Sequence, residues 1–285
     1  MSDALSRTLL TRDAILLTDQ VAIVTGGGSG IGRGIAIGLA EFGADVAIVD
    51  INADVAEEAA ERVREKGRRA HVVVADLTDR DAARAAVASA REALGRVDIL
   101  VNNVGGTRPI KLVDITDRQA DRQIDLNLKS LVATTQAAVR AMIDGGKGGS
   151  VINIASIEGL RAAPGYAVYS ACKAGMINFT RTLALEVAEH GVRVNCIAPD
   201  LVPTEHMARF APVLTSPEGK EAQARYIPLG RAGNQDDCAG AAVFLASAMA
   251  AYVTGVTISV DGGTWASSGW TRTDQTPSTG WKLFD

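Results

Sequence analysis

Seven short runs rich in β-branched and other apolar residues recur along this chain, each separated from the next by a segment of helical length. Such runs are typical of strands buried on both faces, and their alternation with helices predicts a parallel sheet. The runs are 21–25, 45–50, 70–75, 98–102, 151–155, 192–197 and 256–260. We therefore predict an α/β fold: a doubly wound Rossmann fold with a seven-stranded parallel sheet and helices on both faces.

Glycine punctuation supports this prediction independently. Gly43, Gly67, Gly95 and Gly191 each follow a helical stretch and precede a predicted strand. Helices commonly end on a left-handed residue, and glycine adopts that conformation without strain. The sequence shows no internal repeat and no interdomain linker, so we expect one large domain over 19–263, preceded by an N-terminal arm over 1–18.

Composition excludes several classes of function. The 285 residues are 47% hydrophobic, which suffices for a large core, and the net charge of −4 carries no concentrated basic face for nucleic acid. No apolar run is long enough to span a membrane, and the first residues lack the apolar core of a secretory signal, so we expect a cytoplasmic protein. Three cysteines and three histidines are widely scattered, and no metal site is expected. The cysteines are Cys172, Cys196 and Cys238.

A glycine-rich turn joins the first predicted strand to the helical run after it. Its sequence, residues 25–32, reads Thr-Gly-Gly-Gly-Ser-Gly-Ile-Gly. Glycines permit a tight turn and close approach of a ligand, while the free N–H groups at the helix start attract a pyrophosphate. A merely flexible loop is the alternative, but the position in the first βα unit favours phosphate binding. The residues expected to bind are Gly26, Ser29, Gly30, Ile31 and Gly32.

An acidic residue ends the second predicted strand. Asp50 lies at the distance from the glycine turn where a carboxylate accepts both hydroxyls of a ribose. It would repel a 2′-phosphate, and no Lys or Arg stands at 27–29, 51 or 52 to receive one. We therefore expect NAD rather than NADP, with a strand-end cap as the alternative role of Asp50.

Tyr169 and Lys173 stand four residues apart in a helix-length segment. That spacing puts the phenol and the ammonium on one helix face. A cation favours phenolate, and lowering a phenol pKa from about 10 to about 7 takes roughly 4 kcal/mol, which the ammonium and a second positive charge are expected to supply. The pattern alone is weak, because an exposed helix pair has the same spacing.

Taken together, the ordered motifs resemble the short-chain dehydrogenase/reductase family, of the compact single-domain type. The resemblance covers about 17–263. The motifs are Thr25-Gly-Gly-Gly-Ser-Gly-Ile-Gly32, Asp76-Leu77, Asn102-Asn103-Val104-Gly105, Asn127, Ser156, Tyr169-x-x-x-Lys173, Pro199 with Val202 and Thr204, and Asp261-Gly262-Gly263.

The resemblance implies that Asn127, Ser156, Tyr169 and Lys173 form one catalytic set. Tyr169 would exchange the proton of the alcohol, and Ser156 would bind the substrate oxygen. Lys173 would hold the phenolate and bind the nicotinamide ribose. Asn127 would distort its helix and anchor a water leading to solvent. Taken singly, Ser156 reads equally as a strand-end turn and Asn127 as a satisfied buried amide.

Further cofactor contacts and a homotetramer are also implied. Asp76 and Leu77 would flank the adenine, Asn102 would lie beside the adenosine, and Val202 and Thr204 would contact the carboxamide and phosphate. All follow strands, where open α/β sheets bind ligands. Turn formation between strand and loop is the alternative role for Asn102, and the role considered for Asn103.

Two positions depart from the family pattern, each at a loop near the expected site. Val104 replaces a usual alanine, and Asp200 replaces the glycine after Pro199, which removes easy access to positive φ. We expect the loop above the nicotinamide to follow a different path. Glu158, Arg161 and Arg108 follow motif positions and are candidates for the substrate mouth.

Two further segments lie outside the motifs. Residues 201–230 contain four prolines around a helical patch and are expected to form a substrate lid. Residues 264–285 contain Trp265, Trp270, Trp281 and Phe284 in a chain that is only 4% aromatic, so we expect this tail to pack on a neighbouring subunit.

The sequence thus predicts an NAD-dependent oxidoreductase that interconverts a small-molecule secondary alcohol and its ketone, with Tyr169 as general acid/base. Two alternatives stay open. A 3-oxoacyl-thioester reductase would usually draw on NADPH, which Asp50 disfavours. A non-catalytic NAD-binding scaffold would have no need of the complete Ser156, Tyr169 and Lys173 set.

Overall fold

A seven-stranded parallel sheet forms the centre of the molecule in the computed structural model, which describes residues 11–274 and 279–283. The strand order is β3-β2-β1-β4-β5-β6-β7. The strands are β1 (Val21–Thr25), β2 (Asp45–Asp50), β3 (Ala70–Val74), β4 (Ile99–Asn102), β5 (Gly149–Ile154), β6 (Val192–Pro199) and β7 (Thr257–Val260). The predicted fold class is confirmed, and strand ends differ from prediction by at most two residues.

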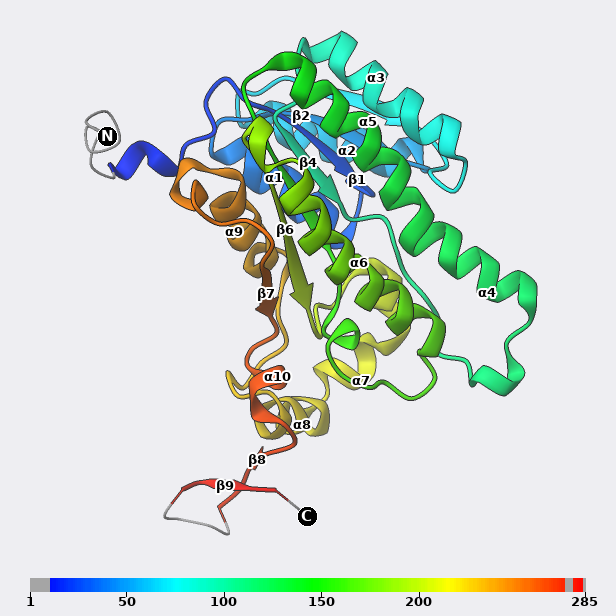
Figure 1. The fold of residues 1–285 in the computed structure, drawn as a ribbon. Coiled ribbons are helices and arrows are strands. Elements are labelled where there is room, and N and C mark those ends of the chain that lie inside the picture. Colours follow the sequence, from blue (N-terminus) through cyan, green and yellow to red (C-terminus); the bar gives the residue numbers. More distant parts are fainter. Residues whose placement is uncertain (1–10, 275–278, 284–285) are drawn as a thin grey trace.

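Helices cover both faces of the sheet (Figure 1). On one side lie α1 (Gly30–Glu41), α2 (Ala53–Glu65) and α9 (Gln235–Ala246). On the other lie α3 (Arg80–Leu94), α5 (Ser130–Gly145) and α6 (Ala167–Glu186). Strand β1 supplies both cores, because alternate side chains point to opposite faces: Ala22 and Val24 pack toward α1, and Val21 and Ile23 toward α3.

Helix ends occur where the glycines predicted them. The φ angles are +105° at Gly43, +74° at Gly67, +91° at Gly95 and +70° at Gly191. All four therefore occupy the left-handed region expected of helix C-caps. At the other end of the domain, Leu17 is fully buried and its N–H bonds Phe42 O at 2.7 Å, so the chain joins the domain by that residue. The predicted arm lies mostly in residues 1–10, outside the described residues.

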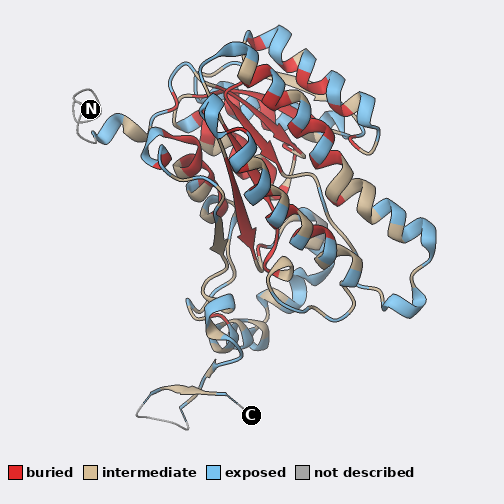
Figure 2. Cartoon of the chain, viewed as in Figure 1, coloured by how far each residue is buried: buried red, intermediate tan, exposed pale blue. Residues whose placement is uncertain are grey.

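The segment after β6 is helical and more exposed than the sheet (Figure 2). It contains the 3₁₀ helix Glu205–Phe210, α7 (Ala211–Thr215) and α8 (Pro217–Tyr226). Figure 1 shows the arrowheads of β6 and β7 pointing toward these helices. The segment expected to be a lid thus lies at the carboxyl edge of the sheet.

The C-terminal tail extends away from the domain as α10 (Thr264–Ser267) and a hairpin of β8 (Thr271–Arg272) and β9 (Trp281–Lys282) (Figure 1). Trp265 is 43% and Trp270 47% exposed, which is unusual for the largest apolar side chain. The guanidinium of Arg272 lies 5.6 Å from the centre of the Trp281 ring. Phe284, also expected to take part, lies outside the described residues.

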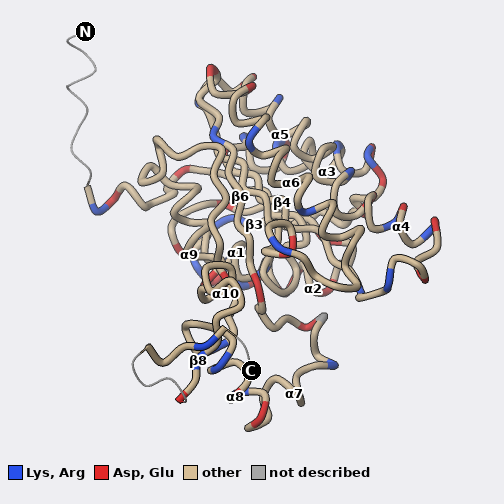
Figure 3. The backbone as a smooth tube through the Cα atoms, turned by 60° about the horizontal axis from the view of Figure 1, so that its bottom comes forward, with Lys and Arg blue, Asp and Glu red and all other residues tan. Residues whose placement is uncertain are grey.

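Charged residues of both signs are spread over the molecule (Figure 3). Lys and Arg are interspersed with Asp and Glu along the chain (Figure 3). Among the described residues, no helix is long and apolar enough to cross a membrane. Within the same ranges, no group of three or more His, Cys, Asp or Glu side chains is arranged to hold a metal ion. The remaining structured segments in the described ranges are α4 (Asp117–Ile124), the π-helical turn Asp125–Lys129 and short 3₁₀ turns.

Candidate active site

The glycine turn between β1 and α1 leaves no room for side chains. A Cβ on Gly32 would lie 2.1 Å from Gly26 O, and one on Gly28 would lie 2.9 Å from Asp50 Oδ2. Gly26 and Gly30 have φ of +60° and +54°, which also favours glycine. The turn thus brings bare backbone to the start of α1, as a pyrophosphate requires.

Asn103, immediately after β4, braces this turn. Its backbone N–H bonds Thr25 Oγ1 at 2.9 Å, and its side-chain amide donates to Thr25 O and Gly26 O, both at 3.1 Å. Sequence reasoning offered only turn formation for Asn103. The sequence feature that could have predicted this contact is an amide side chain directly after β4, the strand next to β1.

Asp50 lies at the end of β2 with its carboxylate against the glycine turn. Asp50 Oδ2 accepts from Gly28 N at 3.0 Å, and Oδ1 accepts from Asn52 N at 3.1 Å. The carboxylate therefore lies beside the glycine turn, at the edge where a ribose would follow a pyrophosphate.

Tyr169 and Lys173 share one face of α6. The Lys173 ammonium lies 5.6 Å from the centre of the Tyr169 ring, and it donates to Ile154 O at 2.7 Å. Lys173 is only 3% exposed, whereas Tyr169 keeps partial solvent contact. The proposed acid/base pair is thus assembled, with the lysine anchored to the end of β5.

Burial shifts the pKa values of both Tyr169 and Lys173 toward their neutral forms. Burial raises the pKa of Tyr169 from its ordinary 10 to about 12. Burial also lowers the pKa of Lys173 to about 8. In the chain alone, desolvation of the phenolate therefore keeps the pKa of Tyr169 above its ordinary value. A further positive charge is needed.

Asn127 lies fully buried in a π-helical turn, Asp125–Lys129, that interrupts α4 and α5. Its side-chain amide donates to Gln123 O and Gly106 O, both at 2.9 Å, and accepts from Gly106 N at 2.9 Å. Single π-turns of this kind often mark functional sites. The helix distortion expected at Asn127 is present.

Lys173 and Asn127 approach the same glycine. A Cβ on Gly105 would lie 3.1 Å from Lys173 Nζ and 2.7 Å from Asn127 Oδ1. The segment 103–106 therefore contacts the glycine turn at one end and the Lys173 and Asn127 pair at the other.

Asn102 points into the core rather than toward the edge of the sheet. Its amide donates to Thr135 Oγ1 at 2.8 Å and to Asn153 Oδ1 at 2.9 Å, and its oxygen accepts from Thr134 Oγ1 at 2.6 Å. Asn153 in turn donates to Thr180 Oγ1 at 2.8 Å. The Asn102 side chain has no donor left for an adenosine, so only its backbone can make the expected contact.

The other expected cofactor residues occupy the same edge of the sheet. The backbone and hydroxyl of Thr78 bond Asp76 and lower its pKa. Leu77 and Val202 are each 4% exposed and pack into the protein. The Thr204 methyl lies 3.0 Å from a Cβ built on Gly30, so the segment expected to be a lid packs directly on the glycine turn.

A series of hydrogen bonds and ion pairs connects Ser156 with Thr264 at the start of the tail. Ser156 donates to the Glu158 carboxylate, and Arg161 bridges Glu158 Oε1 at 3.1 Å and Asp200 Oδ1 at 3.2 Å. Thr264 Oγ1 donates to Asp200 Oδ2 at 2.6 Å. Only Asp19 and Ser268 have positive φ among the described non-glycine residues, so Asp200 replaces the usual glycine with an ordinary backbone and new side-chain bonds.

Glu205 reaches the start of α1 from the lid. Its Oε2 accepts from Gly30 N at 3.0 Å, and its Oε1 accepts from Arg33. Burial opposes the charge of Glu205, but hydrogen bonds and Arg33 hold its pKa below the ordinary value. The carboxylate takes donors that a pyrophosphate would use. A contact between residues 175 positions apart leaves no local signal in the sequence.

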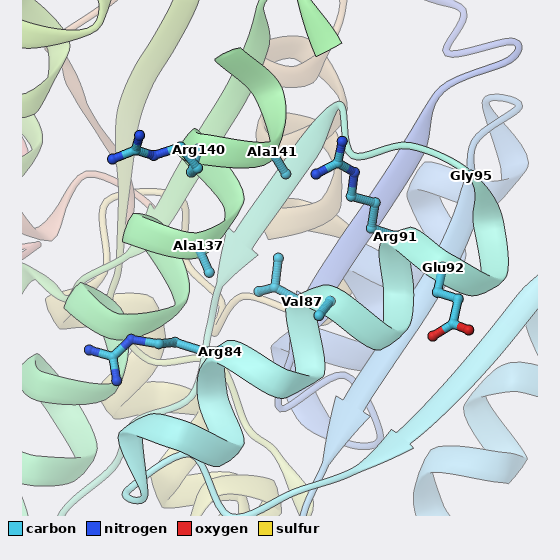
Figure 4. A pocket seen from close by; sticks show the side chains of 9 residues that line it. Arg84, Val87, Arg91, Glu92, Gly95, Ala137, Arg140 and Ala141 are labelled. Carbon is cyan, nitrogen blue, oxygen red and sulfur yellow. The ribbon is translucent and has the colours of Figure 1, made fainter. Parts of the chain in front are cut away.

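A separate surface pocket of about 410 Å³ lies between α3 and α5 (Figure 4). No residue of the predicted site lines it. Its lining is Arg84, Val87, Ala88, Arg91, Glu92, Gly95, Ala137, Arg140 and Ala141.

Comparison with known proteins identifies the family. The profile described as Enoyl-(Acyl carrier protein) reductase matches residues 26–264. The chain is 39% identical to a 3-oxoacyl-(acyl carrier protein) reductase of Chlamydia muridarum, over 87% of this chain and 98% of that one. It is 38% identical to a sorbitol dehydrogenase of Cereibacter sphaeroides, over 88% and 99%. The chain belongs to the short-chain dehydrogenase/reductase family.

Solved structures of this family agree with the fold. Carveol dehydrogenase from Mycobacterium avium, in complex with NAD, aligns with a TM-score of 0.82 at 32% identity, over 88% of this chain and 99% of that one. A protein from Agrobacterium tumefaciens with bound NADP aligns with a TM-score of 0.80 at 35% identity, over 90% and 100%. As a short-chain dehydrogenase/reductase, this chain is an oxidoreductase that uses a nicotinamide cofactor.

Proposed function

We propose that this short-chain dehydrogenase/reductase interconverts a secondary alcohol and its ketone with NAD. The observation that carries the proposal is the convergence of Tyr169, Ser156, Lys173 and Asn127 at the carboxyl edge of the sheet. When bound, the nicotinamide accepts a hydride from the alcohol carbon or returns one to the ketone. Tyr169 takes the alcohol proton in oxidation and gives it to the forming alkoxide in reduction.

The choice of NAD is supported by Asp50. Its carboxylate lies against Gly28 and would repel a 2′-phosphate, and Arg33, the nearest arginine along α1, is paired with Glu205. Gly26, Ser29, Gly30, Ile31 and Gly32 would hold the pyrophosphate. The remaining contacts would come from Asp76, Leu77, Asn102, Val202 and Thr204.

The protonation states explain why the cofactor matters for the proton as well as the hydride. With the pKa of Tyr169 at about 12 and that of Lys173 at about 8, the chain alone keeps the phenol protonated. An oxidised nicotinamide ring would add positive charge beside the phenol and favour phenolate. Lys173 would bind the nicotinamide ribose, and Asn127 would connect the site to water.

Turnover measurements test this function. Alcohols and ketones are assayed with NAD(H) and NADP(H), following the absorbance of reduced nicotinamide. We expect activity with NAD(H), and Asp50→Ala should shift preference toward NADP(H). A preference for NADP(H), with activity on 3-oxoacyl thioesters, would instead favour the reductase alternative that the family profile and the Chlamydia relative suggest.

Tyr169→Phe distinguishes an enzyme from a binding scaffold. We expect retained NAD binding with turnover lowered by about 10²–10⁴-fold, the usual contribution of a positioned acid/base group. Unchanged turnover would remove Tyr169 from the mechanism.

We also propose a cytoplasmic homotetramer. The location is supported by the three unpaired, buried thiols, which suit a reducing compartment. The assembly is supported by family resemblance and by the exposed Trp265 and Trp270 of the tail. Deleting residues 266–285 should change the mass measured by light scattering or the Michaelis constant. If neither changes, the tail is dispensable.

A further inference from the structure

The hydroxyl proton of Ser156 is held by a neighbouring carboxylate. Ser156 ends β5 and caps the 3₁₀ turn Ile157–Gly159, where its oxygen accepts from Glu158 N at 3.2 Å. Its O–H donates to Glu158 Oε2. A serine has one proton to donate, so in this arrangement Ser156 can only accept a hydrogen bond from a substrate.

The carboxylate is fixed in place. Arg161 occupies Glu158 Oε1 and ties it to Asp200, whose other oxygen accepts from Thr264. The side chains of Glu158 and Asp200 are only 18% and 17% exposed. Two carboxylates share one guanidinium, so this cluster carries a net negative charge and disfavours an anionic group on the substrate.

This arrangement conflicts with the chemistry proposed above. A forming alkoxide needs hydrogen-bond donors, and Ser156 is the donor expected beside Tyr169. A simple alcohol has only its reacting hydroxyl. That hydroxyl donates its proton to Tyr169, so it cannot also donate to Glu158 and replace the Ser156 hydroxyl there. A second hydroxyl on the adjacent carbon can donate to Glu158 and release that proton.

We propose that Glu158 determines substrate class, by selecting alcohols that carry a second hydroxyl next to the reacting carbon. Glu158 acts through Ser156 and is thus a positioning residue as well as a contact for that second hydroxyl. Substrates of this kind are vicinal diols and polyols without acidic groups. The inference rests on the proposed function and makes it more specific.

The first test uses 2,3-butanediol and 2-butanol, which differ by one hydroxyl beside the reacting carbon. With NAD, we expect kcat/KM for the preferred stereoisomer of the diol to exceed that for 2-butanol by about 100-fold or more, as sites built to bind a hydroxyl achieve. In Glu158→Ala the ratio should fall by at least about tenfold, with activity on 2-butanol rising. Glu189→Ala, an exposed glutamate distant in the chain, should keep the wild-type ratio.

The outcomes separate the two proposals. Equal turnover of diol and 2-butanol by the wild type, or an unchanged ratio in Glu158→Ala, would overturn the role of Glu158 and leave the proposed function intact. Turnover of other alcohols but neither of these two would also overturn the diol assignment. No turnover of any alcohol or ketone with either cofactor would overturn both.

A second test needs no turnover and covers the case in which Glu158→Ala folds poorly. The groups that face Tyr169 are Ser156, Glu158, Tyr166, Cys172 and Lys173. In the conservative variant Glu158→Gln, loss of the negative charge and a freer Ser156 proton should lower the pKa of Tyr169 by about one unit. Carbon-13 tyrosine NMR measures this pKa, with Tyr169→Phe used for assignment. An unchanged pKa would show that Glu158 does not hold the Ser156 proton.

Discussion

Two polar clusters near the candidate site, one neutral and one charged, are built in opposite ways. Beneath the cofactor edge, Asn102, Asn153 and Thr180 form a neutral network in which each side chain is at most 3% exposed and donates or accepts internally. Next to Ser156, by contrast, the side chains of Glu158, Arg161 and Asp200 are charged and partly exposed.

The difference shows that one cluster fixes the positions of the strands, while the other responds to pH and ligand. Neutral amides and hydroxyls join β4, β5, α5 and α6 without titrating, so the network holds the strands in register at any pH. The charged cluster is coupled to pH and to ligand, since Glu158 carries a charge close to Tyr169 and is tied through Arg161 to Asp200. We therefore expect mutations in the network to affect stability, and mutations in the charged cluster to affect selectivity and pH dependence.

The largest expected effect follows from breaking the neutral network. Asn153→Ala leaves one N–H of the Asn102 amide without an acceptor, removes the donor to Thr180 Oγ1 and opens a cavity in the core, which should cost about 3 kcal/mol in free energy of unfolding. Urea unfolding measures it. Asn52→Ala, which removes an exposed helix cap, should cost about 1 kcal/mol and is the control. A shifted pH optimum of turnover in Asn153→Ala would contradict the contrast between the clusters.

Lys173 belongs to neither cluster, and removing its charge should stabilise the folded protein, whereas Asn153→Ala should destabilise it. Its pKa of about 8 lies below the ordinary value, so the folded state disfavours the charge, and that penalty is complete below pH 8 and lost as pH rises toward 10.5. Lys173→Met should abolish turnover yet raise the free energy of unfolding at pH 7 by about 2 kcal/mol, after allowing for the lost bond to Ile154 O. The gain should shrink at pH 10. The exposed Lys129→Met should change stability little, and a destabilised Lys173→Met would contradict the argument.

Asp200 tests the charged cluster itself. Burial raises the pKa of its carboxyl, so ionisation costs stability above that pKa and costs nothing below the ordinary value near 4. Asp200→Asn should therefore be more stable than the wild type at pH 7, by less than about 1 kcal/mol, with no difference at pH 3.5. Urea titrations at the two pH values measure this. A loss as large as that of Asn153→Ala would show that the two clusters are built alike.

The smallest effect concerns cofactor binding. Glu205 places a negative charge on the donors of Gly30 and Arg33. Glu205→Gln should tighten NAD binding about two- to threefold, since the pyrophosphate no longer competes with a carboxylate. Isothermal titration calorimetry with NAD measures the Kd. Glu218→Gln, on the first turn of α8, is the control, and weaker binding in Glu205→Gln would mean that Glu205 stabilises the bound state instead.

The sequence predicted features that depend on local periodicity. Strand positions, glycine caps, the pairing of Tyr169 with Lys173 and the approach of Asp50 to the glycine turn all follow from spacing within one or two elements. Glu205 and Asp200 could not be placed, because their partners lie far away in the chain. The burial that raises the pKa of Tyr169 could not be predicted, because pairing is visible in a sequence and desolvation is not.

The short segment 103–106 contacts two parts of the site, the glycine turn and the pair Lys173 and Asn127. Asn103 supports the glycine turn, while Gly105 and Gly106 touch Lys173 and Asn127. A substitution that suits one end therefore disturbs the other, and saturation mutagenesis of the whole chain should find fewer tolerated replacements in these four positions than in the surface helices. Engineering that swaps the adenosine-binding half from a relative should carry this linker along with it.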